Sequence, residues 1–179
     1  MNHISANYSM CLGINTILAL EQFLIMAINY QMLKKELLNL CKRVLQDRID
    51  LTKKAMDQAQ ASANEESKSS SGDKYETGRA MMQIEKENAA GQLAEALNLK
   101  RALDQIPPNK FSDIIQIGSI VITNNGNFYI SVAIGKIELN GQDYFAISPV
   151  SPVGKEMINR KAGDSFIVNN RSFKVKGVH

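Results

Sequence analysis

Side chains that commonly carry catalysis or bind metal ions are few in this sequence and lie far apart. The two histidines, His3 and His179, are near the chain ends, where order is usually poorest. The two cysteines, Cys11 and Cys41, have neither CxxC spacing nor a neighbouring histidine. Zinc, Ser-His and Cys-His chemistry all need a histidine held beside its partner, so the sequence argues against these enzyme classes. It also argues against a disulfide framework, and a reducing, cytoplasmic compartment is expected.

One pair of carboxylates has a spacing with a definite physical meaning. Asp73 and Glu76 follow Gly72 and lie three residues apart, at the end of a polar stretch. At the start of a helix, Asp73 can accept a hydrogen bond from the backbone N–H of Glu76, and the Glu76 side chain can reach back. The pattern alone favours this capping box, because the start of nearly every helix has unsatisfied N–H groups.

Composition and motifs narrow the remaining classes. The chain of 179 residues is 44% apolar and 22% charged, which is ordinary for a globular protein. Its net charge of +3 is too small for the basic stripe that duplex binding usually needs, so nucleic acid is expected only as an indirect partner. The sequence contains no GxGxxG, GxxxxGK(S/T) or GxSxG, and therefore no nucleotide-binding or hydrolase signature.

Two long helices are expected to position the acidic pair. Apolar residues recur at spacings of three, four and seven between residues 32 and 62 and again between 82 and 106. A small, polar stretch near residues 63–74 predicts a turn, and Pro107 ends the second helix. Residues 32–106 therefore predict an antiparallel coiled-coil hairpin with helices over about Leu33 to Ala61 and Tyr75 to Gln105. The apolar stripe of the first helix is expected to comprise Leu33, Leu37, Leu40, Val44, Leu51, Ala55 and Ala59. The residues expected at the interface between the two helices are Leu37, Leu40, Val44, Leu93, Leu97 and Leu103.

Residues 1–31 form an apolar leader. No Lys or Arg precedes its apolar run, and Glu21 interrupts the roughly 20 apolar residues that a membrane span requires. Neither a secretory signal nor a membrane anchor is therefore expected. We interpret the leader as an extension outside the fold, with translation starting at Met32, and expect its deletion to leave stability nearly unchanged.

The apolar period changes to two after Phe111. Runs rich in β-branched and aromatic residues, among them one expected strand from Phe128 to Ile134, are separated by turn signals at Asn125-Gly126, Asn140-Gly141 and Asn169-Asn170. Ser151 followed by Pro152 predicts an N-cap and a short helix to about Ile158. Residues 111–179 thus predict a small antiparallel β-sheet domain with one short helix, and the whole chain falls in the α+β class.

Three segments of this second part resemble the C-terminal domain of the bacterial Gre transcript cleavage factors. They are Gly118-Ser119-Ile120-Val121, Ile147-Ser148-Pro149-Val150-Ser151-Pro152-Val153-Gly154 and Lys161-Ala162-Gly163-Asp164. A long helical hairpin precedes this domain in Gre factors, so the resemblance covers roughly residues 32–179. It implies an FKBP-like fold for the C-terminal domain, although likeness to the FKBP prolyl isomerases is no warrant for their activity.

The resemblance implies RNA polymerase as the partner and no enzymatic activity of the chain's own. In Gre factors the globular domain docks at the rim of the polymerase secondary channel and the coiled coil inserts. An Asp and a Glu three residues apart then help hold a catalytic Mg²⁺, a role that Asp73 and Glu76 match and that suits a cation preferring hard oxygen ligands. The matching segments supply the docking candidates Ser151, Pro152, Gly154 and Lys161, and Lys155, which directly follows the second segment, is a further candidate.

Two functions stay open on the sequence alone. One is a polymerase-binding elongation regulator that stimulates cleavage of backtracked RNA with Mg²⁺ shared with the polymerase and no cofactor of its own. The other is a non-catalytic interaction module, monomeric or dimeric through the coil. The three serines before Gly72 make the turn longer and looser than a compact acidic tip, and Tyr75 is bulky at its apex. Both departures favour binding without cleavage.

Overall fold

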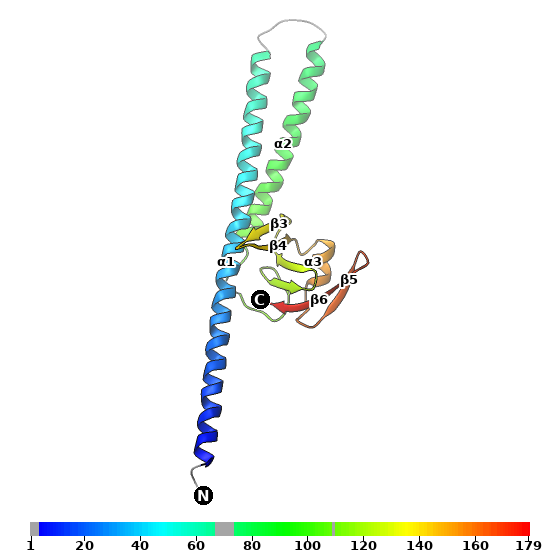
Figure 1. Ribbon diagram of the computed structural model, residues 1–179. Helices are drawn as coiled ribbons and strands as arrows, with labels where there is room; N and C mark the ends of the chain where they lie inside the picture. Colours follow the sequence, from blue (N-terminus) through cyan, green and yellow to red (C-terminus); the bar gives the residue numbers. More distant parts are fainter. Residues whose placement is uncertain (1–3, 67–73, 109) are drawn as a thin grey trace.

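The computed structural model describes residues 4–66, 74–108 and 110–179 and has an α+β architecture (Figure 1). Two long helices, α1 (Ile4–Glu66) and α2 (Lys74–Asp104), precede a six-stranded sheet that carries one short helix, α3 (Pro152–Met157). The sheet lies beside the middle of α1, which extends past it in both directions (Figure 1). α2 accompanies only the part of α1 that leads to the tip of the hairpin.

α1 and α2 form the expected antiparallel pair in one continuous register. Polar contacts link the two helices at matched steps, namely Lys42–Asp104 (2.6 Å), Gln46–Lys100 (2.6 Å) and Gln60–Lys86 (2.8 Å). Moving four or fourteen residues along α1 from one contact to the next moves the partner back by the same number of residues along α2. The pairing therefore continues without a register shift from the sheet to the outer part of the hairpin.

Tight packing of the hairpin is confined to its base. The buried row on α1 recurs every four residues, as Leu37, Cys41, Leu45 and Ile49, and on α2 the buried residues are Ala96 and Leu103. Farther toward the tip, none of the side chains that the structure describes on either helix is fully buried. The outer hairpin is a slender two-helix rod.

The buried stripe of α1 is only partly the predicted one. Leu37 is buried as expected and Leu40 is half-buried, but Leu51 is 69% exposed and that part of the prediction is wrong. The prediction considered contact with the second helix alone. Because α1 also packs on the sheet, Cys41 and Leu45 join the core instead.

The first helix begins at Ile4, well before the expected start near Leu33. The segment expected to be a leader is therefore helical from Ile4, and its last turn reaches the sheet domain, since the Tyr30 ring stacks on His179. Within the part of the chain that the structure describes, no helix combines the length and the apolar character needed to cross a bilayer.

The sheet has the strand order β3-β4-β2-β1-β6-β5. Its strands are β1 (Ile120–Thr123), β2 (Gly126–Ile130), β3 (Gly135–Leu139), β4 (Gln142–Ile147), β5 (Ser165–Val168) and β6 (Arg171–Val178). The three turn signals hold: Gly126, Asn140, Gly141, Asn169 and Asn170 all have positive φ at the β1–β2, β3–β4 and β5–β6 connections.

The expectation of a wholly antiparallel sheet is wrong for one pair, because β2 and β4 run parallel. The run predicted as one strand from Phe128 to Ile134 breaks after Ile130, and Gly135 starts a separate strand. This break carries the chain across to the far side of β4. β3 then pairs with β4 as a hairpin, which leaves β4 beside β2 in parallel orientation.

Alternating side chains of the sheet build two cores, one on each face. Ile120 and Tyr129 point to the face covered by α1, where they pack with Leu37 and Leu45. Their neighbours in sequence point to the opposite face and pack around α3, in a core of Ile115, Val121, Phe128, Ile130, Met157, Phe166, Val168, Phe173 and Val175. The period of two seen in the sequence is thus the alternation between a helix-covered face and an α3-covered face.

Candidate functional site

The acidic pair falls, in sequence, where the segment joining α1 and α2 leads into α2. α1 ends at Glu66 and α2 begins at Lys74, so Asp73 directly precedes the first residue of α2 in sequence. Asp73 itself lies outside the described residues. Glu76 belongs to the first turn of α2, but its side chain also lies outside what the structure describes. The predicted capping and metal roles of this pair therefore both stay predictions.

No other place in the described chain gathers metal ligands. Among residues 4–66, 74–108 and 110–179, no three His, Cys, Asp or Glu side chains come together as a metal-binding group. The tip pair therefore stays the one metal hypothesis that the sequence raised.

Three of the docking candidates form the N-terminal cap of α3. Ser151 Oγ accepts a hydrogen bond from the Gly154 backbone N–H at 3.0 Å and donates one to the Ser148 carbonyl at 2.7 Å. Pro152 follows at the first helical position, as predicted. Gly154 is required by space, because a Cβ there would lie 2.1 Å from the Ser148 carbonyl oxygen. These residues shape the loop, which leaves the neighbouring Val150 71% exposed.

The remaining two candidates are exposed cations. Lys155 and Lys161 are both exposed, and neither ammonium forms an ion pair with an acidic side chain among the described residues. The backbone of Lys161 is fixed, since its N–H donates to Asp164 Oδ2 at 2.9 Å. The two ammonium groups are thus available to an acidic surface of a partner.

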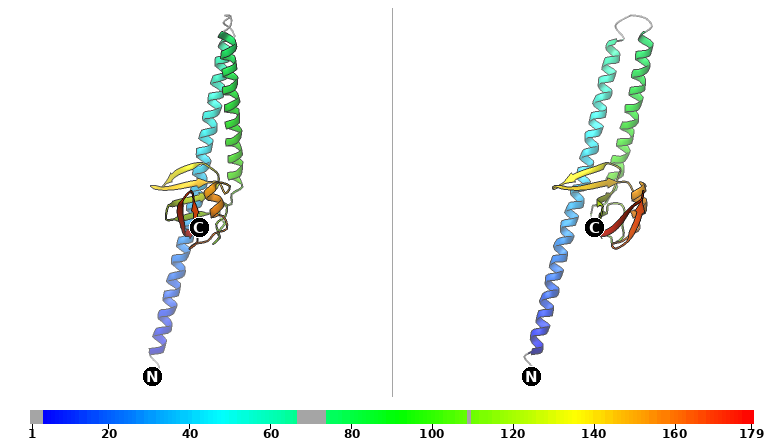
Figure 2. Two further views of the ribbon diagram at one scale, coloured as in Figure 1. Left: turned by 90° about the vertical axis from the view of Figure 1, so that its right-hand side faces the viewer. Right: turned by 45° about the vertical axis from the view of Figure 1, so that its right-hand side comes forward.

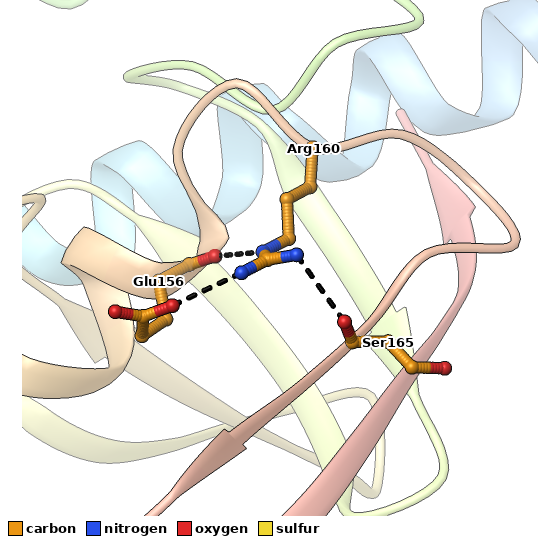
Figure 3. Close-up of polar contacts among 3 residues, drawn as sticks. All are labelled: Glu156, Arg160 and Ser165. Carbon is orange, nitrogen blue, oxygen red and sulfur yellow. Dashed lines mark hydrogen bonds and ion pairs between the residues drawn. The ribbon is translucent and has the colours of Figure 1, made fainter.

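Arg160, between these two lysines, is engaged within the domain (Figure 3). Its guanidinium donates to the backbone carbonyl and the carboxylate of Glu156, the latter at 3.0 Å, and to the Ser165 carbonyl at 3.2 Å. It also lies 5.2 Å from the centre of the Phe166 ring. Arg160 therefore joins α3 to the start of β5 and does not add to the available charge.

A second cluster, at the junction of α1 with the sheet, was missed by the sequence reasoning. His179 was expected to lie at a poorly ordered end, yet its backbone exchanges hydrogen bonds with Ile120 at 2.8 and 2.9 Å. Its ring stacks on Tyr30 with 3.4 Å between ring centres and 6° between planes. Lys34, next to this stack, is only 3% exposed and donates to the Lys110 carbonyl at 2.7 Å.

Burial controls the protonation of this junction. It lowers the pKa of His179, with a further lowering from the nearby Lys34 charge, and it lowers the pKa of Lys34 itself. Burial raises the pKa of the Cys41 thiol to about 11, and the adjacent Ser131 hydroxyl opposes this shift only in part. Cys41 is therefore a protonated core thiol at neutral pH and no nucleophile.

An open groove of about 520 Å³ runs between α1 and the sheet beside this junction. Its lining carries no charged side chain and consists of Met26, Asn29, Tyr30, Leu33, Ile122, Asn127, Gln142 and Tyr144. The amides and phenols offer hydrogen bonds to a neutral group. Nothing in the groove pairs a nucleophile with a base.

Comparison of the chain with models of protein families, with curated proteins and with solved structures gave no match. The likeness to Gre factors therefore rests on the hairpin and on the three segments quoted above, and the function is argued from geometry.

Proposed function

We propose that this protein is a regulator of transcription elongation that binds RNA polymerase and inserts its hairpin into the secondary channel. The proposal includes a Gre-type C-terminal domain of FKBP-like fold as the docking body, a cytoplasmic location and no catalytic activity of the chain's own. In this proposal Asp73 and Glu76 assist a Mg²⁺ shared with the polymerase.

The observation that carries the proposal is the long, slender hairpin that projects from one side of a compact domain (Figure 1). The α1–α2 register is continuous out to Gln60 and Lys86, and the outer part has no wide core. Such a rod is narrow enough to enter a channel, and its described part has no core wide enough to enclose a ligand. The acidic pair stands where the second helix of that rod begins.

The exposed end of the domain supports a docking role. Lys155 and Lys161 lie close to the exposed Val150 in sequence, and the Ser151 cap begins the helix that carries Lys155. Exposed cations suit an acidic protein rim, and their charges steer association more than they set affinity. Charge reversal at Lys155 and Lys161 is thus expected to weaken polymerase binding, whereas reversal at the exposed Lys176 of β6 serves as the matched control.

The decisive experiment measures transcript shortening in stalled, backtracked elongation complexes with wild-type protein and with Asp73→Asn. If the carboxylates hold Mg²⁺, the substitution abolishes stimulated cleavage while polymerase binding and helix content stay intact, because a neutral amide is a poorer ligand for a hard dication. If the pair only caps α2, the same change is nearly harmless, since Asn caps about as well as Asp.

The alternative is a non-catalytic interaction module, and the capping-box spacing of Asp73 and Glu76 favours it. A pull-down with core RNA polymerase separates the cases. Polymerase binding without release of RNA fragments above the intrinsic rate means a channel-binding regulator whose acidic pair is structural. Absence of binding to core polymerase and to elongation complexes overturns the proposed function altogether.

A further inference from the structure

We call residues 4–32 of α1 the arm. Its last turns lie beside the sheet, where Tyr30 stacks on His179, and Figure 2 shows the rest continuing straight beyond the sheet as a single helix, on the side away from the hairpin. At 1.5 Å per residue the arm is roughly 40 Å long. An isolated helix of this length gains most of its stability in proteins from packing on a partner.

Apolar residues of the arm follow a coiled-coil spacing. Seven positions of the arm, which we call the seam, are spaced alternately four and three residues apart, except that the last step, from Ile28 to Met32, is again four. They are Met10, Ile14, Ile17, Glu21, Leu24, Ile28 and Met32. From Met10 to Ile28 this is the a/d pattern of a heptad repeat over three heptads, and Met32 stands one residue past the next a/d position, Gln31. Other apolar residues of the arm, such as Leu18 and Phe23, lie outside the seam. The seam ends at Met32, because the next positions with this spacing are Lys35 and Asn39, both polar and exposed.

The seam faces away from the protein's own sheet. Of its described side chains, Leu24 is 61%, Ile28 48% and Met32 58% exposed, and the flanking Ile25 is 58% exposed. The side chains that line the groove toward the sheet, among them Asn29 and Tyr30, belong to a different face of the helix. The intramolecular contacts of α1 therefore leave Leu24, Ile28 and Met32 uncovered.

We propose that the seam is a homodimerisation surface, on which the arm of a second copy packs as a two-helix coiled coil. This inference goes beyond the proposed polymerase binding and does not depend on it. Identical seams satisfy the requirement of a two-fold interface, in which one patch meets itself. Glu21 is the one charged residue between positions 4 and 32, so two arms can approach without extended repulsion.

The size of the seam suits a dimer of this kind. A large apolar side chain removes on the order of 100 Å² from water when it is buried, so the six apolar seam residues supply roughly 600 Å² per copy. Flanking residues such as Ile25 add to this area. A standard stable interface needs about 800 Å² per partner and about 20–30 residues a side, which the arm approaches.

Glu21 gives the proposal a specific signature. It occupies the middle of the seam, midway between Met10 and Met32. Both symmetric arrangements, parallel in register and antiparallel about the centre, therefore bring the Glu21 carboxylates of two copies together. Like charges at this position weaken the dimer, because the two carboxylates repel each other in a seam that is otherwise apolar.

The test is the oligomeric state of the full chain, measured by sedimentation equilibrium over a range of concentrations. We expect the wild-type protein to dimerise. The Glu21→Leu dimer should have a dissociation constant at least about tenfold lower, because the substitution replaces a repulsive pair by an apolar contact. Ile28→Glu is expected to raise the dissociation constant by roughly a hundredfold or more, since it puts an unpaired charge into the seam. Gln22→Glu adds the same charge at an exposed arm position outside the seam and should leave the dissociation constant nearly unchanged.

Circular dichroism of each variant keeps the outcome interpretable, because Ile28→Glu must retain the folded hairpin and sheet. A chain that stays monomeric at every concentration overturns the proposal. So does a dimer that Ile28→Glu and Gln22→Glu weaken equally, or a monomer whose arm binds phosphatidylcholine vesicles instead. Polymerase binding can be measured separately with Ile28→Glu, so that failure of one proposal is distinguishable from failure of the other.

Discussion

Lys34 shows how single side chains fix the joint between the helices and the sheet. Its ammonium is almost completely buried, donates to the Lys110 carbonyl at 2.7 Å and lies 5.3 Å from the centre of the Phe111 ring. Burying this charge is costly, which is why the pKa of Lys34 is lowered. The charge-assisted hydrogen bond and the cation–π contact offset part of that cost and hold the linker after α2 against α1.

The neighbouring His179 predicts a pH dependence of stability. Burial and the Lys34 charge lower the pKa of His179 in the folded state below its usual 6.5. The unfolded chain therefore binds the proton more readily, and the stability present above about pH 6.5 is lost as the pH falls through the folded pKa. Chemical denaturation at pH 7.5 and at lower pH values should show a falling free energy of unfolding.

The matched variant is His179→Phe, which keeps an aromatic ring on Tyr30 but cannot be protonated. Carboxylates elsewhere also titrate in acid, so the measured quantity is the difference between wild type and His179→Phe. That difference should stay flat above about pH 7 and change in the acidic range, as the pH falls below the usual pKa of 6.5. A constant difference across this range would show that protonation of His179 does not change the stability of the junction between α1 and the sheet.

Local sequence signals predicted only some of these side-chain contacts. The Ser151 cap was predictable, because the cap and the N–H that it satisfies are three residues apart. The Tyr30–His179 stack and the Lys34–Lys110 bond join residues far apart in sequence. No periodicity or motif records such pairs, and the burial of Lys34 contradicts the usual exposure of lysine.

At the scale of elements, two glycines should respond oppositely to the same substitution. Gly91 is exposed within α2 and an added Cβ meets nothing within 4 Å, so Gly91→Ala should stabilise the protein by about 0.5–1 kcal/mol. At Gly154 the Cβ would lie 2.1 Å from the Ser148 carbonyl, so Gly154→Ala should destabilise by about 2 kcal/mol or more. Urea denaturation of both variants measures the two effects; equal shifts would contradict the predicted packing of α3.

Elements with strong local signals were predicted well, and those set by tertiary pairing were not. The helix pair, α3 and the three β-turns follow from periodicity, capping and Asn-Gly chemistry. The break after Ile130 was missed, because the apolar run continues through Val132 and Ile134. Only the pairing of β3 on the far side of β4 shows why the strand ends there and why β2 and β4 are parallel.

At the scale of the whole molecule, the single helix α1 has three structural roles along its length. Its outer half pairs with α2 in the hairpin, its middle covers one face of the sheet, and the arm leaves the sheet in the opposite direction (Figure 1). A dimer formed by the arms would leave the hairpins and the exposed Lys155 and Lys161 free. The proposed polymerase docking and the proposed dimerisation would therefore use separate surfaces.

The candidate site could be proposed from the sequence but not assigned by it. Asp73 and Glu76 have the spacing of both a helix cap and a cation-holding pair, and spacing alone does not separate the two. The seam of the arm was not predicted at all, because the same apolar residues were interpreted as a leader. Only the continuation of α1 from Ile4 through the sheet region makes their spacing that of a helix surface.

Two truncations test where the folded body ends and the arm begins. A chain lacking residues 2–24 keeps Tyr30 and the groove, so its monomer should melt within about a degree of the monomeric full-length reference, Ile28→Glu. A chain lacking residues 2–31 loses the Tyr30–His179 stack. Aromatic pairs contribute about 0.5–1.5 kcal/mol, which corresponds to a fall of roughly 1–6 °C in melting temperature for a chain of this size.

Tyr30→Ala in the Ile28→Glu background separates the stack from the rest of the deleted segment, and it should reproduce most of the loss seen on removing residues 2–31. Equal melting temperatures for the two truncations would place the whole segment outside the fold. A large loss already on removing residues 2–24 would instead mean that the arm packs on its own chain, and the seam would then be covered from within. Thermal unfolding of these variants thus decides between a covered and an uncovered seam without measuring dimerisation itself.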